Sequence, residues 1–226
     1  MIREIIKYAV ALVLSVYLIT QVRKPSRWVG RLFARLMNKS HSDLTDWGLG
    51  HVVIEKDFSI LDVGCGGGRT VNKMALAATE GSVQGVDYAP GSVAESHAYN
   101  KQLIADGRVH IEHASVSKLP FAADRFDLVT AIETQYYWPN LPEDMREILR
   151  VLKPGGTLLI VAENYKGGRL DWLEGPLMKF VLRSSRLSPE DQRNLFTSAG
   201  YIGVQVVEEP RKGWICAIGV KPNPSA

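Results

Sequence analysis

The stretch LDVGCGGGRT at 61–70 constrains the fold of this chain more than any other stretch. It overlaps a short apolar run at 59–63 that is typical of a buried parallel strand, and apolar residues with helical spacing follow at 71–78. Glycines stand in the turn at Gly64, Gly66 and Gly68. They permit positive φ angles and let a ligand approach the backbone, while the helix that follows directs free N–H groups to the same place. The stretch therefore predicts a strand, a ligand-binding turn and a helix.

Strand-like and helical segments alternate from residue 59 onward. We expect strands at 59–63, 82–87, 108–113, 126–132, 156–162, 201–207 and 214–220, and helices at 70–79, 91–105, 142–151 and 188–199. This alternation predicts an α/β domain with a mostly parallel sheet covered by helices, and the last two strands are close enough to form a hairpin. Residues 164–187 break the alternation, and we expect an inserted loop or helical cap there.

The N-terminal part has the composition of a membrane anchor. Residues 5–20 are nearly all apolar, and six basic residues follow before the next acid, Asp43. We expect residues 1–24 to form a hydrophobic helix that spans the membrane or lies on its surface, because the run is at the short end of the about 17 to 25 residues that a span requires. A helix packed on the soluble domain is the alternative. The positive flank predicts a membrane-associated protein whose main domain lies in the cytoplasm.

Residues 25–51 are expected to form a basic amphipathic helix and a lid segment next to the membrane anchor. Arginines recur every fourth residue between 27 and 39 opposite an apolar stripe, which predicts a basic amphipathic helix that contacts anionic headgroups or presents a solvated face. Residues 40–51 lack strong periodicity, and we expect them to close over a neighbouring pocket. The net charge is +3, and residues 1–58 hold nine Lys and Arg against five Asp and Glu. Because the remaining chain has no basic and aromatic recognition motif, we expect no nucleic-acid partner.

Asp87 ends the second expected strand, about twenty residues after the first glycines, where a carboxylate can accept hydrogen bonds from two ribose hydroxyls. The alternative for Asp87 is a helix N-cap ahead of Pro90. A dinucleotide fingerprint would place its third glycine at the position of Arg69. A nicotinamide-dependent oxidoreductase is therefore disfavoured.

Together these features resemble class I S-adenosylmethionine-dependent methyltransferases over residues 45–221. The motifs that carry the resemblance are Leu61–Gly68, Asp87, Leu119–Phe121, Arg125–Val129 and Leu149–Gly156. The resemblance implies a Rossmann-like seven-stranded sheet of order 3-2-1-4-5-7-6 with helices on both faces. It also implies that residues 52–226 bind S-adenosyl-L-methionine.

The resemblance further implies cofactor contacts from Asp62, Gly64, Cys65, Gly66, Gly68, Asp87, Tyr88, Ser115 and Val116. At the position aligned with Ser115, many relatives carry an aspartate that binds the adenine amino group. A serine hydroxyl accepts such a hydrogen bond less strongly than a carboxylate does. We therefore expect the backbone around Ser115 and stacking on Tyr88 to contribute to adenine binding.

The acceptor side is expected at 131–139, just after the fourth strand. Its aromatic residues, Tyr137 among them, face the transferred methyl group or pack the edge of the core. Glu133 is expected to hold the cationic part of the cofactor or to act as a general base. His41 is a second candidate base, with His51 behind it. The histidines and carboxylates are scattered, so we expect no metal site.

The sequence thus predicts a membrane-associated methyltransferase that acts on a small, lipophilic acceptor. Alternatives are a methyltransferase of a soluble thiol, amine or metalloid, and a module that binds S-adenosylmethionine without turnover. Cys65 and Cys216, the two cysteines, are expected to be small core residues rather than reactive thiols or a disulfide. The oligomeric state is left open.

Overall fold

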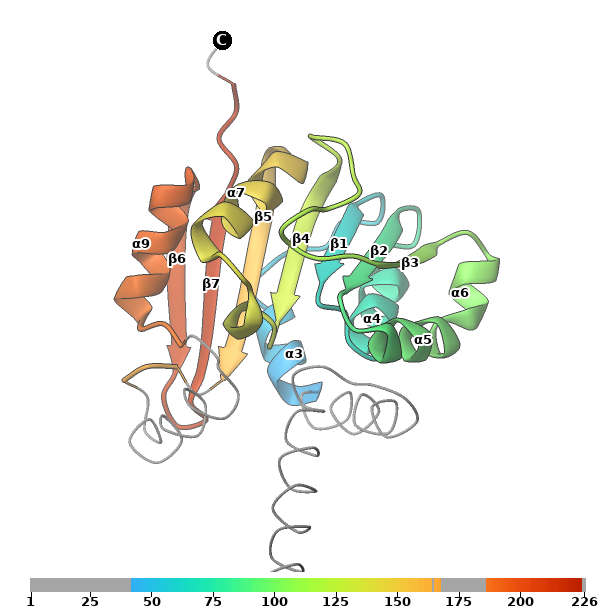
Figure 1. Cartoon of the computed structure of the whole chain (residues 1–226), viewed down its shortest axis with the longest axis horizontal. Coiled ribbons are helices and arrows are strands. Elements are labelled where there is room, and N and C mark those ends of the chain that lie inside the picture. Colours follow the sequence, from blue (N-terminus) through green and yellow to red (C-terminus); the bar gives the residue numbers. More distant parts are fainter. Residues whose placement is uncertain (1–41, 164, 168–185, 225–226) are drawn as a thin grey trace, which may run out of the picture.

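The computed structural model describes residues 42–163, 165–167 and 186–224 (Figure 1). The described elements, in chain order, are α3 (Ser42–Leu49), β1 (Ser59–Val63), α4 (Arg69–Ala77), β2 (Ser82–Asp87), α5 (Pro90–Tyr99), α6 (Lys101–Ala105), β3 (Val109–His113), β4 (Phe126–Ile132), the 3₁₀ turn η1 (Gln135–Tyr137), α7 (Leu141–Val151), β5 (Leu152–Glu163), α9 (Pro189–Ala199), β6 (Ile202–Glu209) and β7 (Trp214–Val220).

The strands form one seven-stranded sheet of order β3-β2-β1-β4-β5-β7-β6. Neighbours from β3 to β5 pair in parallel, whereas β7 is antiparallel to both β5 and β6. The carboxyl ends of the parallel strands therefore meet at one edge, the lower one in Figure 1. This topology confirms the predicted class I methyltransferase fold.

Two apolar clusters cover opposite faces of the sheet, because alternate residues of each buried strand point to opposite sides. On one face, α7 and α9 pack side chains such as Met145, Ile148 and Phe196 against the sheet. On the other face, α3 and α4 contribute Leu44 and Met74. The four helical side chains Leu44, Met74, Met145 and Ile148 are at most 1% exposed. Each contributes about 1.5–3 kcal/mol to stability by its burial.

Three predicted segments differ from the structure. β5 begins at Leu152 instead of 156, and the helix expected over 91–105 is divided into α5 and α6 at Asn100. Residues 42–49, expected as part of an irregular lid, form the helix α3. Leu44, Gly48 and Leu49 are buried on one side of α3, so tertiary packing stabilises a helix whose short amphipathic pattern and glycine are weak signals on their own.

The predicted anchor at 1–24, the basic helix at 27–39 and most of the expected cap at 164–187 lie outside the described residues. Within the described ranges, no helix combines the length and apolar composition needed to cross a bilayer. Membrane association therefore stays a prediction from the sequence.

Candidate functional site

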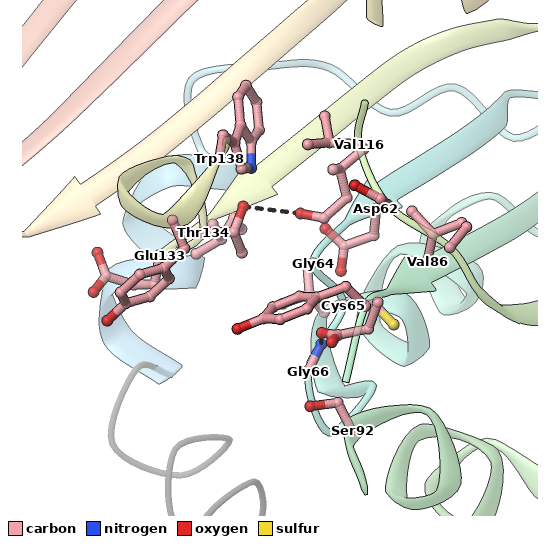
Figure 2. Close-up of a pocket in the computed structure, with 18 of the residues that line it drawn as sticks. Asp62, Gly64, Cys65, Gly66, Val86, Ser92, Val116, Glu133, Thr134 and Trp138 are labelled. Atoms are coloured by element: carbon pink, nitrogen blue, oxygen red, sulfur yellow. Dashed lines mark hydrogen bonds between the residues drawn. The ribbon is translucent and has the colours of Figure 1, made fainter. Parts of the chain in front are cut away.

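A cavity of about 350 Å³ opens at the carboxyl ends of β1, β2, β3 and β4 (Figure 2). Most of the residues predicted to bind the cofactor or the acceptor line it, namely Asp62, Gly64, Cys65, Gly66, Asp87, Tyr88, Ser115, Val116, Glu133 and Tyr137. The other lining residues are Thr45, Val63, Gly67, Arg69, Thr70, Val86, Ser92, Ala114, Ile132, Thr134, Trp138 and Pro139. The structure thus joins the glycine turn, the end of β2 and the segment after β4 in one site.

The glycine turn packs closely against Thr134 at Gly64 and leaves space beside its backbone at Gly66. Gly64 has a φ of 78°, and a Cβ there would lie 2.4 Å from Cγ2 of Thr134. Gly66 has a φ of 52°, and a Cβ there would meet no atom within 4 Å. Because Gly66 also lines the cavity, this open space lets a ligand approach the backbone closely.

Gly68, predicted to contact the cofactor, does not line the cavity. It is the N-cap of α4, in the left-handed conformation, and a Cβ there would lie 2.3 Å from Oγ of Ser96. The Asn100 side-chain amide donates to the Gly68 carbonyl at 2.9 Å and accepts from the Asn72 amide at 3.1 Å. Gly68 therefore holds the turn against α5, and its direct contact with the cofactor stays a prediction.

Cys65 lines the cavity, but its thiol is not activated as a nucleophile. Its thiol is buried and donates to Oγ of Ser96 at 3.8 Å. Burial, with a smaller effect of the nearby carboxylates, raises the pKa of the Cys65 thiol well above its usual range. Burial also raises the pKa of Cys216 to about 12. Both cysteines are thus small buried residues, as predicted.

Asp87 is held with its carboxylate in the cavity. Its two oxygens accept from the backbone N–H groups of Gly66 at 3.0 Å and Ala89 at 2.8 Å. Burial raises the pKa of Asp87, although these hydrogen bonds oppose the shift. The N-cap of α5 is Ala89, so the alternative of Asp87 as N-cap is wrong. The Ser92 side chain is a third partner of this carboxylate. Because a carboxylate offers about four acceptor positions, it can still accept from a ligand hydroxyl.

Asp62 is a second buried carboxylate at the cavity, 2% exposed. The Thr130 hydroxyl, on the neighbouring strand β4, donates to Oδ1 of Asp62 at 2.7 Å. Burial raises the pKa of Asp62 to about 7; the Thr130 hydrogen bond lowers it, and repulsion from Asp87 adds to the rise. A positively charged ligand group nearby would offset the cost of burying the charged form of Asp62.

Glu133 is anchored in the wall of the cavity. It follows β4 with a φ of 58°, and its Oε1 accepts from the Tyr136 hydroxyl at 2.7 Å and from the Glu163 N–H at 2.6 Å. In Figure 2 its carboxylate lies beyond Thr134 as seen from the glycine turn. These contacts orient Glu133, while its roles as cofactor ligand or base stay predictions.

The aromatic residues after β4 divide between the two predicted roles. Tyr136 is 6% exposed and packs with Ala162, Tyr165 and Ile215, so it belongs to the core. Tyr137 and Trp138 line the cavity. The wall that carries them is tied to α9 by a buried pair of amides, since Gln135 and Gln192 each donate to the other, at 3.2 and 2.6 Å.

Of the two histidines predicted as bases, only His51 lies within the described residues. His41 lies outside the described residues. His51 is absent from the lining, and its Nδ1 lies 2.8 Å from the Trp47 carbonyl oxygen. The described residues contain no group of three or more His, Cys, Asp or Glu side chains able to hold a metal ion.

Three residues around the cavity were not identified from the sequence as site residues. Thr45 reaches the lining from α3, and Ser92 from the first turn of α5, where it hydrogen-bonds Asp87. Thr130 supports Asp62 from the neighbouring strand. Only Ser92 leaves a sequence signal, because it stands in the first turn of the helix that follows the acidic strand end.

Replacing Gly66 by alanine is expected to weaken binding of an adenosine-containing ligand about 10-fold, because the new Cβ would occupy the space that the ligand needs. The positive φ should cost about 1 kcal/mol of stability. Isothermal titration calorimetry and thermal unfolding measure the two effects. Gly203→Ala is the matched control, since Gly203 has a φ of 60°, no atom within 4 Å of its Cβ position and no place in the cavity lining. Equal affinities of the two variants would contradict this account of the turn.

Residues 61–160 match the family model described as a methyltransferase domain. The chain is 30% identical over 124 residues to 27-O-demethylrifamycin SV methyltransferase of Amycolatopsis mediterranei, covering 55% of this chain and 45% of that protein. It is 28% identical over 136 residues to sterol 4-C-methyltransferase strm-1 of Caenorhabditis elegans, covering 60% of this chain and 39% of that protein. The chain thus spans less than half of each of these two relatives.

Solved structures share the fold. A chain from the complex of the Haloferax volcanii Trm112 methyltransferase activator with a methyltransferase has a TM-score of 0.72 and 21% identity, with 85% of this chain and 97% of that chain covered. Geranyl diphosphate C-methyltransferase of Streptomyces coelicolor, solved with S-adenosyl-L-homocysteine, has a TM-score of 0.68 and 14% identity, with 80% and 79% covered.

Proposed function

We propose that this chain, whose residues 61–160 match a methyltransferase domain, transfers a methyl group from S-adenosyl-L-methionine to a small, lipophilic acceptor at a membrane surface. The observation that carries the proposal is that a single cavity joins the glycine turn and Asp87 to the apolar and aromatic residues Ile132, Tyr137 and Trp138. The first group suits the cofactor, and the second suits an apolar acceptor.

The described residues fit this cofactor. Gly66 leaves open space beside the backbone, and Asp87 presents acceptor oxygens where a ribose would lie. Asp62 is buried and its pKa is raised, so a cationic ligand group nearby would stabilise its charged form. The bound cofactor supplies a methyl group on a positively charged sulfur atom, which is a good leaving group.

The protein's part in the reaction is mainly to align the acceptor and to exclude water. Tyr137 and Trp138 provide an apolar wall, and the hydrogen bonds from Tyr136 and Glu163 fix Glu133 beside it. We assign Glu133 to the orientation of the cationic part of the cofactor, with proton removal from the acceptor as its alternative role.

The acceptor class is supported by what the relatives are named for. The sterol 4-C-methyltransferase acts on a sterol by its name, and geranyl diphosphate is an isoprenoid. The membrane location rests on the sequence alone, through the apolar run at 5–20 and the basic residues that follow it. In this arrangement the catalytic domain lies in the cytoplasm.

The full chain, incubated with methyl-labelled S-adenosyl-L-methionine and separated lipid and aqueous extracts, is expected to label a component of the lipid extract. Thin-layer chromatography and scintillation counting measure the transfer, and the Asp87→Ala variant is the control for background. Label in the aqueous extract alone would favour a soluble acceptor. Failure of both extracts to yield S-adenosyl-L-homocysteine would favour a binding module without turnover.

The same preparation tests the location. The full chain should float with vesicles that contain anionic phospholipid, and less of it should float when Arg23, Lys24, Arg27 and Arg31 are replaced by glutamine. No flotation of the unaltered chain would refute the membrane proposal and leave the methyl-transfer proposal standing.

A further inference from the structure

The helix α3 is seated directly on the sheet at the cavity end. It lies across the lower ends of β4 and β5 in Figure 1. A Cβ on Gly48 would lie 2.4 Å from Cγ2 and 3.0 Å from Cγ1 of Val161, so only glycine permits this approach. Leu44 and Leu49 share an apolar cluster with Val161. The position of α3 is thus set by close contact with β5.

The contact between α3 and β5 brings Thr45 to the cavity. Thr45 precedes Gly48 by three residues, so the two lie on the same side of the helix. The Val161 carbonyl, in turn, accepts from the Glu133 N–H at 2.9 Å. Thr45 is 6% exposed and lines the cavity. Because Val161 contacts α3 and also bonds Glu133, Thr45 belongs to the β5 side of the cavity wall, where Glu133 lies.

A second contact holds α3 toward the glycine turn. Asp46, the neighbour of Thr45, forms an ion pair with Lys73 of α4, the helix that begins after the turn. Thr45 is consequently carried by a helix that contacts both β5 and α4.

The order of the strands indicates which part of the ligand meets Thr45. Asp87 at the end of β2 marks the ribose, and Ser115 after β3 marks the adenine side. The rest of the cofactor must extend the other way, over β1 toward β4. That part carries an ammonium and a carboxylate group, and a threonine hydroxyl can accept from the former or donate to the latter.

We propose that the Thr45 hydroxyl binds the amino acid end of the cofactor, and that Gly48 is the positioning residue that seats Thr45 there. The inference rests on the proposed function, because it requires S-adenosyl-L-methionine in the cavity. It adds a binding residue from outside the 61–160 match and gives α3 a role as a wall of the site.

The test compares two ligands that differ at this end. S-Adenosyl-L-homocysteine has the amino acid group, whereas 5′-methylthioadenosine lacks it. Thr45→Val, which keeps the shape and removes the hydroxyl, is expected to weaken calorimetric binding of S-adenosyl-L-homocysteine about 10-fold, since hydrogen bonds to charged groups are strong. Binding of 5′-methylthioadenosine should change less than about 2-fold. Thr45→Ser, which retains the hydroxyl, should bind both ligands like the unaltered chain.

The positioning role is tested by compensation. Gly48→Ala should weaken S-adenosyl-L-homocysteine binding, because the new methyl group displaces α3 from Val161. Adding Val161→Ala removes both Cγ atoms that the methyl group would strike, so the double variant should recover most of the affinity. If Gly48→Ala weakened binding only by destabilising the fold, adding Val161→Ala would not restore binding, because Val161→Ala itself removes buried volume and destabilises the fold.

The outcomes separate this inference from the function on which it rests. If the unaltered chain binds neither ligand, the cofactor assignment fails. If it binds both and Thr45→Val leaves them unchanged, or weakens both equally, the role of Thr45 is overturned while the function stands. Failure of Val161→Ala to restore binding to Gly48→Ala would overturn the role of Gly48.

Discussion

Replacing Asp87 by alanine is expected to weaken binding of S-adenosyl-L-homocysteine at least about 100-fold, because the ribose loses its hydrogen bonding to a charged acceptor. The same carboxylate also holds the Gly66 and Ala89 N–H groups, so the turn itself loosens. Since the ribose is common to both ligands, 5′-methylthioadenosine should lose affinity to a similar degree. Isothermal titration calorimetry on the full chain measures both.

Asp106→Ala is the matched control, because it also removes one carboxylate. Asp106 is the exposed C-cap residue of α6 and accepts from the Gln102 side chain, outside the cavity lining. Its affinities should equal those of the unaltered chain. If Asp87→Ala bound S-adenosyl-L-homocysteine within about 3-fold of the unaltered chain, the assignment of the ribose to the end of β2 would be wrong.

The second large effect concerns the stability of the ligand-free protein. Burial raises the pKa of Asp62 to about 7 in the fold, from the ordinary aspartate value of 3.8. Between these values the unfolded chain has released a proton that the folded chain still holds, so stability falls as the pH rises through this window. The full loss above pH 7 amounts to about 4 kcal/mol, since each pKa unit corresponds to about 1.4 kcal/mol.

Asp62→Asn cannot ionise and should lack this loss. Its free energy of unfolding, relative to that of the unaltered chain, is expected to rise by up to about 4 kcal/mol between pH 4 and pH 8. The asparagine carbonyl can still accept from the Thr130 hydroxyl, which preserves the local packing. Urea unfolding at several pH values measures the difference, with Asp106→Asn as the exposed control. A difference that does not change with pH would show that Asp62 ionises freely in the fold.

Much of the sheet could be predicted because its strands are short apolar runs between clear turn signals. The bounds of β1, β2, β4 and β7 agree with the predicted ranges. In a parallel sheet covered on both faces, such runs are buried throughout, so the local pattern and the tertiary environment agree. The glycine turn and Asp87 were predictable for a related reason, since their spacing follows from the strand and turn geometry.

The features that escaped prediction depend on contacts distant in sequence. Asn100 divides the helix expected over 91–105, and its side chain bonds the Gly68 carbonyl, which lies 32 residues away. Thr45 reaches the cavity only because Gly48 meets Val161. Nothing in the local sequence near 42–49 indicates the contact with Val161, so this short helix with a glycine resembled an irregular segment.

The antiparallel strand β7 also determines where the chain leaves the sheet. After β7 the Lys221 backbone pairs with Gly155 and Gly156, at 2.9 Å in each hydrogen bond. This is the amino end of the parallel strands, at the top of Figure 1, opposite the cavity. A biotin or surface linker attached beyond Lys221 should therefore leave the cavity facing solution, so ligand binding can be followed by surface plasmon resonance without blocking the entrance.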